Sequence, residues 1–231
     1  MPLPQISTPT YELVIPSSKK KVKFRPFLVK EEKILILAME SEDPKQIANA
    51  VKDVIGSCIL SKGIRVEKLS TFDIEYIFLN IRGKSVGEDI EIMVTCPDDE
   101  KTQVPAVIHL DEIKVHIDKD HSQDIKLDDE YTMKMKYPSL NEFVKTNLSS
   151  GGDLAVDDTF DLIASCVDQV YSEEESWAGS DCTKKELSDF VGSLNSKQFK
   201  DVEKFFDTMP KLSHKVKVKN PNTDVESEIV L

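Results

Sequence analysis

Cys96-Pro97, in a predicted hairpin turn, is the first place where the residue types suggest chemistry, because the pair resembles half of a zinc knuckle. A knuckle needs a second cysteine about two residues further on, and Asp98 and Asp99 stand there instead. The histidines that follow alternate between strand faces and supply no second pair of ligands. The proline accounts for a turn without a metal. We therefore expect no metal site and no cofactor.

The segment Arg82-Gly83-Lys84-Ser85 contains the Gly-Lys-Ser of a phosphate-binding loop. Such a loop needs another glycine four residues before Gly83 and a preceding strand, but Leu79 occupies that position within a predicted helix. Gly83 is better explained as the C-terminal stop of that helix. The sequence also contains neither Gly-x-Ser-x-Gly nor His-Glu-x-x-His. These observations predict that the protein is not an enzyme.

The four cysteines are sparse, which favours free thiols in a reducing compartment over a disulfide framework. Cys58 and Cys166 fall on apolar helix faces, where a small buried thiol is the ordinary interpretation. Cys182 lies beside Asp181 near a predicted helix N-terminus, a position that can lower the pKa of a thiol. A cytosolic redox or thiol protein that uses Cys182 is therefore kept as an alternative function.

An acidic cluster, Glu173, Glu174 and Glu175, precedes Trp177, the only tryptophan. One interpretation is a solvated helix end, since runs of charge usually face water. The other is an acidic rim around an exposed tryptophan, and tryptophan is a favoured interface anchor. We expect Trp177 to be partly exposed, and these four residues are the predicted partner-binding site.

The elements that must position these residues occur in two similar series. The first predicted series is a hairpin, three helices and a hairpin, over 11–26, 29–41, 43–62, 70–83 and 90–110. The second contains a hairpin, several helices and a closing hairpin, over 125–136, 138–148, 159–171, 183–191, 196–209 and 216–231. This order predicts an α+β fold of two related halves.

Three pairs of segments indicate that the halves arose by internal duplication. They match in the same order: 22–26 with 133–138, 54–59 with 162–167, and 94–99 with 218–223. Convergence of short patterns is the alternative explanation. The predicted units are 1–118 and 119–231, and the second carries an insertion at about 172–192 that includes Trp177.

Composition limits the classes of function. The 231 residues carry a net charge of −12 with 39% hydrophobic and 31% charged residues, a balance typical of a globular protein. The negative charge disfavours nonspecific binding to nucleic acid or an anionic membrane, although it does not exclude a small basic patch. The longest apolar run is far shorter than a membrane span, and the N-terminus lacks a secretory signal pattern.

Several segments together carry a resemblance to a known family, namely 24–33, 72–87, 181–187 and 195–199. They resemble the baseplate hub subunit, or hub assembly protein, family of T-even-like contractile-tailed phages, especially members carried by cyanobacterial phages. The resemblance covers nearly the whole chain but locates no catalytic site. Some relatives carry more cysteines near the equivalent of Cys96, and relatives tend to run further past Leu231, which suggests a trimmed terminus.

This resemblance implies a non-enzymatic virion assembly protein that binds other baseplate hub or tail proteins. It implies assembly in the host cytoplasm and a place in the virion baseplate. A transient assembly chaperone that is absent from the mature virion is the alternative within the same setting.

Overall fold

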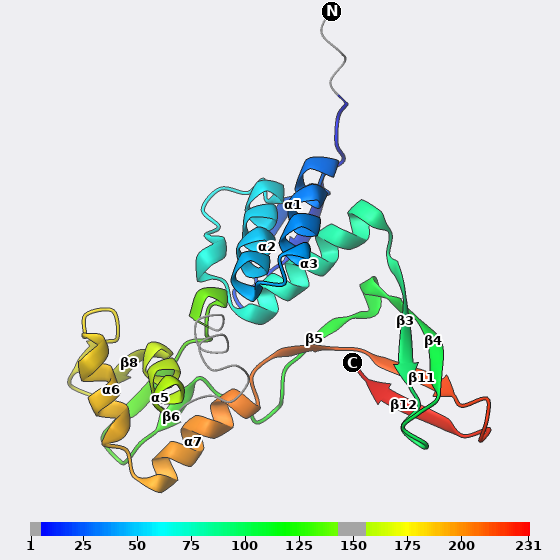
Figure 1. The fold of residues 1–231 in the computed structure, drawn as a ribbon. Coiled ribbons are helices and arrows are strands. Elements are labelled where there is room, and N and C mark those ends of the chain that lie inside the picture. The colour runs from blue at the N-terminus through cyan, green and yellow to red at the C-terminus, as the bar shows by residue number, and fades with distance from the viewer. Residues whose placement is uncertain (1–5, 143–155) are drawn as a thin grey trace, which may run out of the picture.

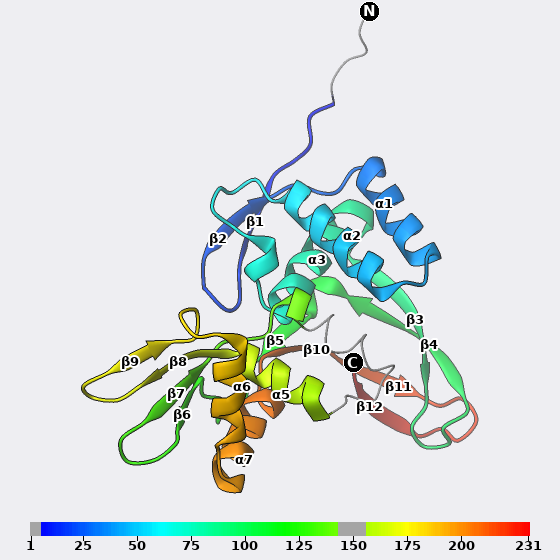
Figure 2. The ribbon, with the colours of Figure 1, turned by 60° about the vertical axis from the view of Figure 1, so that its left-hand side comes forward.

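The computed structural model describes residues 6–142 and 156–231 and is an α+β protein. Its helices and short antiparallel sheets form three packed groups, which Figures 1 and 2 show from two sides. An N-terminal group lies at the top of Figure 1, a second group at the lower left, and a pair of hairpins at the lower right. Each group has its own cluster of buried apolar side chains.

The N-terminal group packs three helices against one hairpin. Phe24, at the end of the second strand, is only 2% exposed and packs among apolar residues of the second and third helices. Asp43 caps the second helix, since its carboxylate accepts from the Lys45 N–H at 2.9 Å. The elements are β1 (Tyr11–Val14), β2 (Lys21–Phe24), α1 (Val29–Glu40), α2 (Pro44–Cys58), a 3-10 turn (Val66–Lys68) and α3 (Thr71–Val86).

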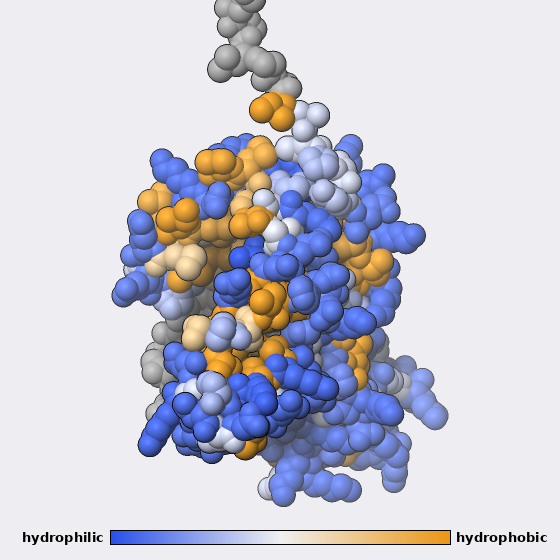
Figure 3. Space-filling model, turned by 90° about the vertical axis from the view of Figure 1, so that its right-hand side faces the viewer, coloured by the Kyte–Doolittle hydropathy of each residue, from blue (hydrophilic) through white to orange (hydrophobic). Residues whose placement is uncertain are grey.

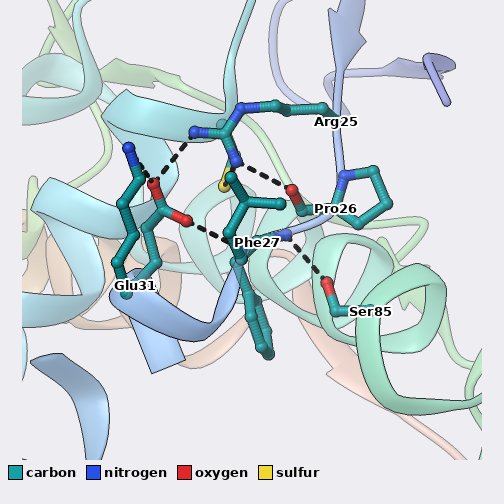
Figure 4. A network of polar contacts seen from close by, with 8 residues as sticks. Arg25, Pro26, Phe27, Glu31 and Ser85 are labelled. Carbon is teal, nitrogen blue, oxygen red and sulfur yellow. Dashed lines mark hydrogen bonds and ion pairs between the residues drawn. The ribbon is translucent and has the colours of Figure 1, made fainter. Parts of the chain in front are cut away.

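An ion pair between half-buried Arg25 and buried Glu31 fixes the connection from β2 to α1 (Figure 4). Arg25 Nη2 lies 2.9 Å from Glu31 Oε1, and the Leu28 N–H donates to Glu31 Oε2 at 2.7 Å. Burial alone would raise the pKa of Glu31, but these hydrogen bonds and the nearby positive charges hold it below its ordinary value. The Phe27 N–H donates to Ser85 Oγ at 2.9 Å, which ties the same connection to α3.

The second group is a four-stranded antiparallel sheet covered by helices. Its strand order is β6-β7-β8-β9. The most buried side chains come from the sheet and all three described helices, among them Met133, Met135, Ile163, Val191 and Phe205. The elements are β6 (Asp124–Lys126), β7 (Thr132–Met135), α5 (Val156–Ser165), β8 (Val167–Tyr171), β9 (Ser176–Ala178), α6 (Lys184–Gly192) and α7 (Ser196–Asp207).

The third group brings together two hairpins that are far apart in sequence. The hairpin of β3 (Asp89–Thr95) and β4 (Gln103–His109) packs on that of β11 (Lys215–Lys219) and β12 (Glu226–Val230). Val94 and Ile108 of the first hairpin share a core with Val216 and Val218 of the second. The core of this third group therefore draws on both predicted units. The boundary between residues 118 and 119 stays a prediction.

The turns of the two hairpins are joined by side-chain hydrogen bonds. Asn220 Nδ2 donates to Asp98 Oδ2 at 3.0 Å, and the Thr223 hydroxyl donates to the same carboxylate. Asn222 Nδ2 donates to Thr102 Oγ1 at 2.9 Å. The hydrogen bonds from Thr223 and Asn220 lower the pKa of Asp98. These aspartate and asparagine side chains therefore serve the contact between the turns.

Two further contacts hold the segments that connect the groups. Strand β5 (Lys114–His116) pairs antiparallel with β10 (Lys211–Ser213), so the segments entering and leaving the second group run side by side. His121, in the predicted connector, hydrogen-bonds Tyr137 Oη at 2.9 Å and Thr208 Oγ1 at 3.0 Å through its two ring nitrogens. Burial lowers the pKa of His121, which favours its neutral form.

Matching hydrogen bonds occur in the two halves. The Arg25 N–H donates to the Cys58 carbonyl at 3.0 Å, and the Lys136 N–H donates to the Cys166 carbonyl at 2.7 Å. Just as Glu31 caps α1, the Glu142 carboxylate accepts from the Ser139 N–H at 2.7 Å. These paired bonds support the duplication, which remains a prediction.

Three expected helix ends were wrong. The helix predicted over 43–62 ends at Cys58, because Ile59 instead forms a β-bridge with Phe24. The helix predicted over 159–171 ends at Ser165, and Val167–Tyr171 is instead strand β8, because Val167 and Val170 pair with β7 in the sheet. Gly83 does not stop α3, which continues to Val86 and is capped by Gly87 with φ of 137°. Gly83 is buried close to the Leu110 side chain. The end of the helix predicted over 138–148 lies outside the described residues.

Phe24→Ala should lower the free energy of unfolding by about 3–5 kcal/mol, because it removes a buried ring and leaves a cavity. Chemical denaturation of the purified protein measures the change. Lys23→Ala is the matched control, since the neighbouring residue on the same strand is exposed. A melting temperature for Phe24→Ala within a degree or two of wild type would contradict the strand facing.

Candidate partner-binding site

Trp177 lies on β9, the edge strand of the four-stranded sheet, rather than in an irregular loop. The strand register pairs Trp177 with Val170, Val170 with Met133, and Met133 with Ile125. Directly paired residues in antiparallel strands project from the same sheet face. Trp177 is therefore the outermost member of an apolar row that begins in the core.

Exposure rises along this row toward the sheet edge. Met133 is fully buried, Val170 is half-buried and Trp177 is 43% exposed, which confirms the expected partial exposure. Beside Trp177 is a largely apolar groove of about 450 Å³, hereafter the Trp177 groove. Its lining residues come from β8, β9, α6 and the adjoining turns: Tyr131, Val167, Val170, Trp177, Gly179, Cys182, Glu186, Leu187 and Phe190.

A close backbone approach shapes one wall of the Trp177 groove. The Gly179 N–H donates to the Asp168 carbonyl at 2.8 Å. A Cβ atom on Gly179 would lie 2.3 Å from the Val167 carbonyl oxygen, so only glycine fits without moving the backbone. The Tyr131 ring lies 6.1 Å from the Trp177 ring between centroids, and both residues line the groove.

The surroundings of the groove are acidic. Glu173, Glu174 and Glu175 lie exposed on the turn between β8 and β9, adjacent to Trp177 in the chain. Glu130 raises the pKa of the Tyr131 phenol, and Glu175 adds to this effect. The negative field of the turn thus reaches an aromatic residue that lines the groove. The predicted cluster and Trp177 are therefore brought together at one edge of the second group.

The cysteines separate into one accessible thiol and three buried ones. Cys182 lines the Trp177 groove, with its Sγ 3.5 Å from the Ala178 carbonyl oxygen. Burial raises the pKa of Cys58 to about 11 and that of Cys166 to about 12, and it also raises the pKa of Cys96. These shifts disfavour the reactive thiolate at the three buried positions.

Over residues 6–142 and 156–231, no group of three or more His, Cys, Asp or Glu side chains has an arrangement that could hold a metal ion. Cys96 is buried in the core shared by the terminal hairpins. Asp99, one of the two residues that replace the second knuckle cysteine, accepts a hydrogen bond from Thr102 Oγ1 at 2.5 Å.

Sequence patterns missed other parts of the accessible surface. Tyr131 reaches the groove from a segment far from Trp177 in sequence, and Phe190 reaches it from the following helix, so no local pattern around Trp177 marks either residue. Helix α1 also exposes apolar side chains, including Ile36 at 50% and Met39 at 67%. Figure 3 shows hydrophobic residues gathered on the upper part of the molecule, in the N-terminal group. The sequence does carry a signal for these exposed side chains, namely the uninterrupted apolar run from Ile34 to Met39. A helix at the surface cannot bury the side chains on all of its sides, so some of this run must face solvent.

Gly179→Ala should destabilise the protein by about 1–3 kcal/mol, because the added methyl group forces β9 away from β8. The free energy of unfolding measures this effect. Gly192→Ala is the control: its Cβ meets no atom within 4 Å at the end of α6, so it should be neutral or stabilise by up to about 1 kcal/mol. Equal behaviour of the two variants would show that β8 and β9 do not approach as closely as described.

Comparison with known proteins adds to this geometry. No curated protein and no solved structure matches the chain. None of the described helices is long and apolar enough to cross a membrane. One family model, described as T4 bacteriophage base plate protein, matches residues 8–231. Since this match spans nearly the entire sequence, the chain belongs to the T4 bacteriophage base plate protein family.

Proposed function

We propose that the protein is a non-enzymatic baseplate hub subunit that binds other hub or tail proteins through the Trp177 groove. Family membership supports a structural or assembly role in a phage baseplate, where a subunit contacts other baseplate proteins. The observation that carries the finer proposal is the groove itself, an apolar row that continues from the core to an exposed tryptophan at the sheet edge.

The chemistry of the groove defines the complementary partner surface. An apolar side chain of the partner would cover Trp177 and Phe190, and that burial is the main source of affinity. Basic residues around that side chain would face Glu173, Glu174 and Glu175, which have no ion-pair partner among the described residues. Opposite charges would speed the encounter, and salt would slow it.

Trp177→Ala should weaken binding to baseplate proteins by about 2 kcal/mol or more, equivalent to about 30-fold, as expected for an interface anchor. The measurement is quantitative co-purification of tagged protein with baseplate proteins from infected cells, followed by mass spectrometry. Because Trp177 also contacts Tyr131, the melting temperature of the variant is measured in parallel. Unfolding of the variant, together with quencher-protected tryptophan fluorescence in wild type, would assign Trp177 to the core.

A charge-reversal variant tests the same surface without removing an apolar group. Glu173, Glu174 and Glu175 are all changed to Lys on the exposed turn, which should reduce association while leaving stability nearly unchanged. The matched control changes the exposed residues Glu67, Glu91 and Glu203 to Lys, which alters the net charge equally elsewhere. Equal loss of association in both variants would assign the effect to overall charge and contradict the groove.

Two experiments separate the proposed hub subunit from the alternative functions, a transient assembly chaperone and a thiol protein. A hub subunit should be present in purified virions, whereas an assembly chaperone should bind baseplate proteins in the host cytoplasm and be absent from the particle. A redox role would require an unusually reactive Cys182. Ordinary alkylation kinetics of Cys182 would count against that role, and the three buried thiols should not interfere with the assay.

A further inference from the structure

A second cavity, of about 390 Å³, lies where the N-terminal group meets the second group. Its walls come from the turn between β1 and β2, the segment leading into α3, and the segment after β7. Four basic side chains line it: Lys20, Arg65, Lys68 and Lys136. It is hereafter the junction cavity.

The junction cavity is basic although the whole chain has a net charge of −12. Asp73 is its single acidic lining residue, and both of its carboxylate oxygens are already engaged. The Ser17 N–H donates to Oδ1 at 3.0 Å, and the hydroxyls of Ser17 and Ser70 donate to Oδ2. Asp73 is also only 1% exposed, so it is poorly placed to pair with the surrounding cations.

The four cations form no ion pair with the described part of the chain. Across the described residues, none of Lys20, Arg65, Lys68 and Lys136 takes part in an ion pair. Like charges that line one cavity repel each other, and an anionic ligand would relieve this repulsion.

Apolar groups in the same walls narrow the choice of ligand. Ile64, Leu69 and Tyr137, all half-buried, line the cavity together with the cations. A bare inorganic anion would leave these groups uncovered, whereas a short peptide offers carboxylates and apolar side chains together. A nucleic acid, with one charge on every phosphate, would meet more of the long-range repulsion of the acidic chain than a short peptide segment would.

We propose that the junction cavity binds a short acidic segment, rich in Asp or Glu, of a partner protein. Arg65 would pair with a carboxylate in a bidentate manner, and the lysines would supply point charges around it. This site differs in position and polarity from the Trp177 groove, which favours a basic partner. The protein would then join two neighbours of opposite charge.

Binding of a fluorescein-labelled six-residue peptide of four Glu and two Leu, followed by anisotropy at low salt, tests this proposal. The full-length protein should bind it at least tenfold more tightly than the same peptide with Gln in place of Glu. Lys68→Glu combined with Lys136→Glu should reduce binding at least tenfold. The control, Lys33→Glu combined with Lys45→Glu, makes the same change in net charge at exposed positions outside the cavity and should bind as wild type does.

Three results would overturn the proposal: equal binding of the Glu and Gln peptides, equal loss in the two double variants, or displacement by equimolar inorganic phosphate. The last result would assign the cavity to a free anion. Melting temperatures establish that each variant is folded. Trp177→Ala should retain the peptide, so loss of this site and loss of the Trp177 groove are distinguishable.

Discussion

Two hairpins from distant parts of the chain share one apolar core, and the placement of the rest of the molecule depends on that contact. The hairpin of β3 and β4 and the hairpin of β11 and β12 bury Val94, Ile108 and Val216 between them. Their turns are held together where Asn220 donates to Asp98. Because the chain leaves one hairpin and returns to the other, the entire second group is tethered at both ends. The pairing of β5 with β10 follows from the same closure, since it aligns the two connecting segments.

The two candidate surfaces lie on this framework and have opposite polarity. The Trp177 groove is the outer end of the second core, where the sheet extends beyond the fully buried part of its apolar row. The junction cavity lies between the first and second groups and gathers unpaired cations around the occupied carboxylate of Asp73. A protein built to join neighbours in an assembly benefits from such a division, because each surface repels the partner that suits the other.

Local patterns predicted the local structure of this chain well and its long-range contacts poorly. Thr183 forms a capping box with Glu186 at the start of α6, and Asp43 caps α2. Both caps involve residues within one helical turn, so the sequence alone displays them. The end of α5 was missed because Val167 continues an apolar pattern compatible with either a helix or a buried strand, and pairing with β7 decides between them. Trp177 was identified from its type and acidic neighbours. The partners that form its groove, such as Phe190, depend on strand register and helix packing, which the sequence does not display.

The central claim is that the Trp177 groove is covered by a partner in the baseplate, and Cys182 provides a direct probe of it. This thiol lines the groove, while the other three cysteines are buried. The decisive measurement is the rate of Cys182 alkylation, followed by mass spectrometry, in the free protein and in baseplate assemblies isolated from infected cells. The account predicts ready alkylation in the free protein and strong protection in the assembly. Equal rates in the two states would show that the groove stays open and would contradict it.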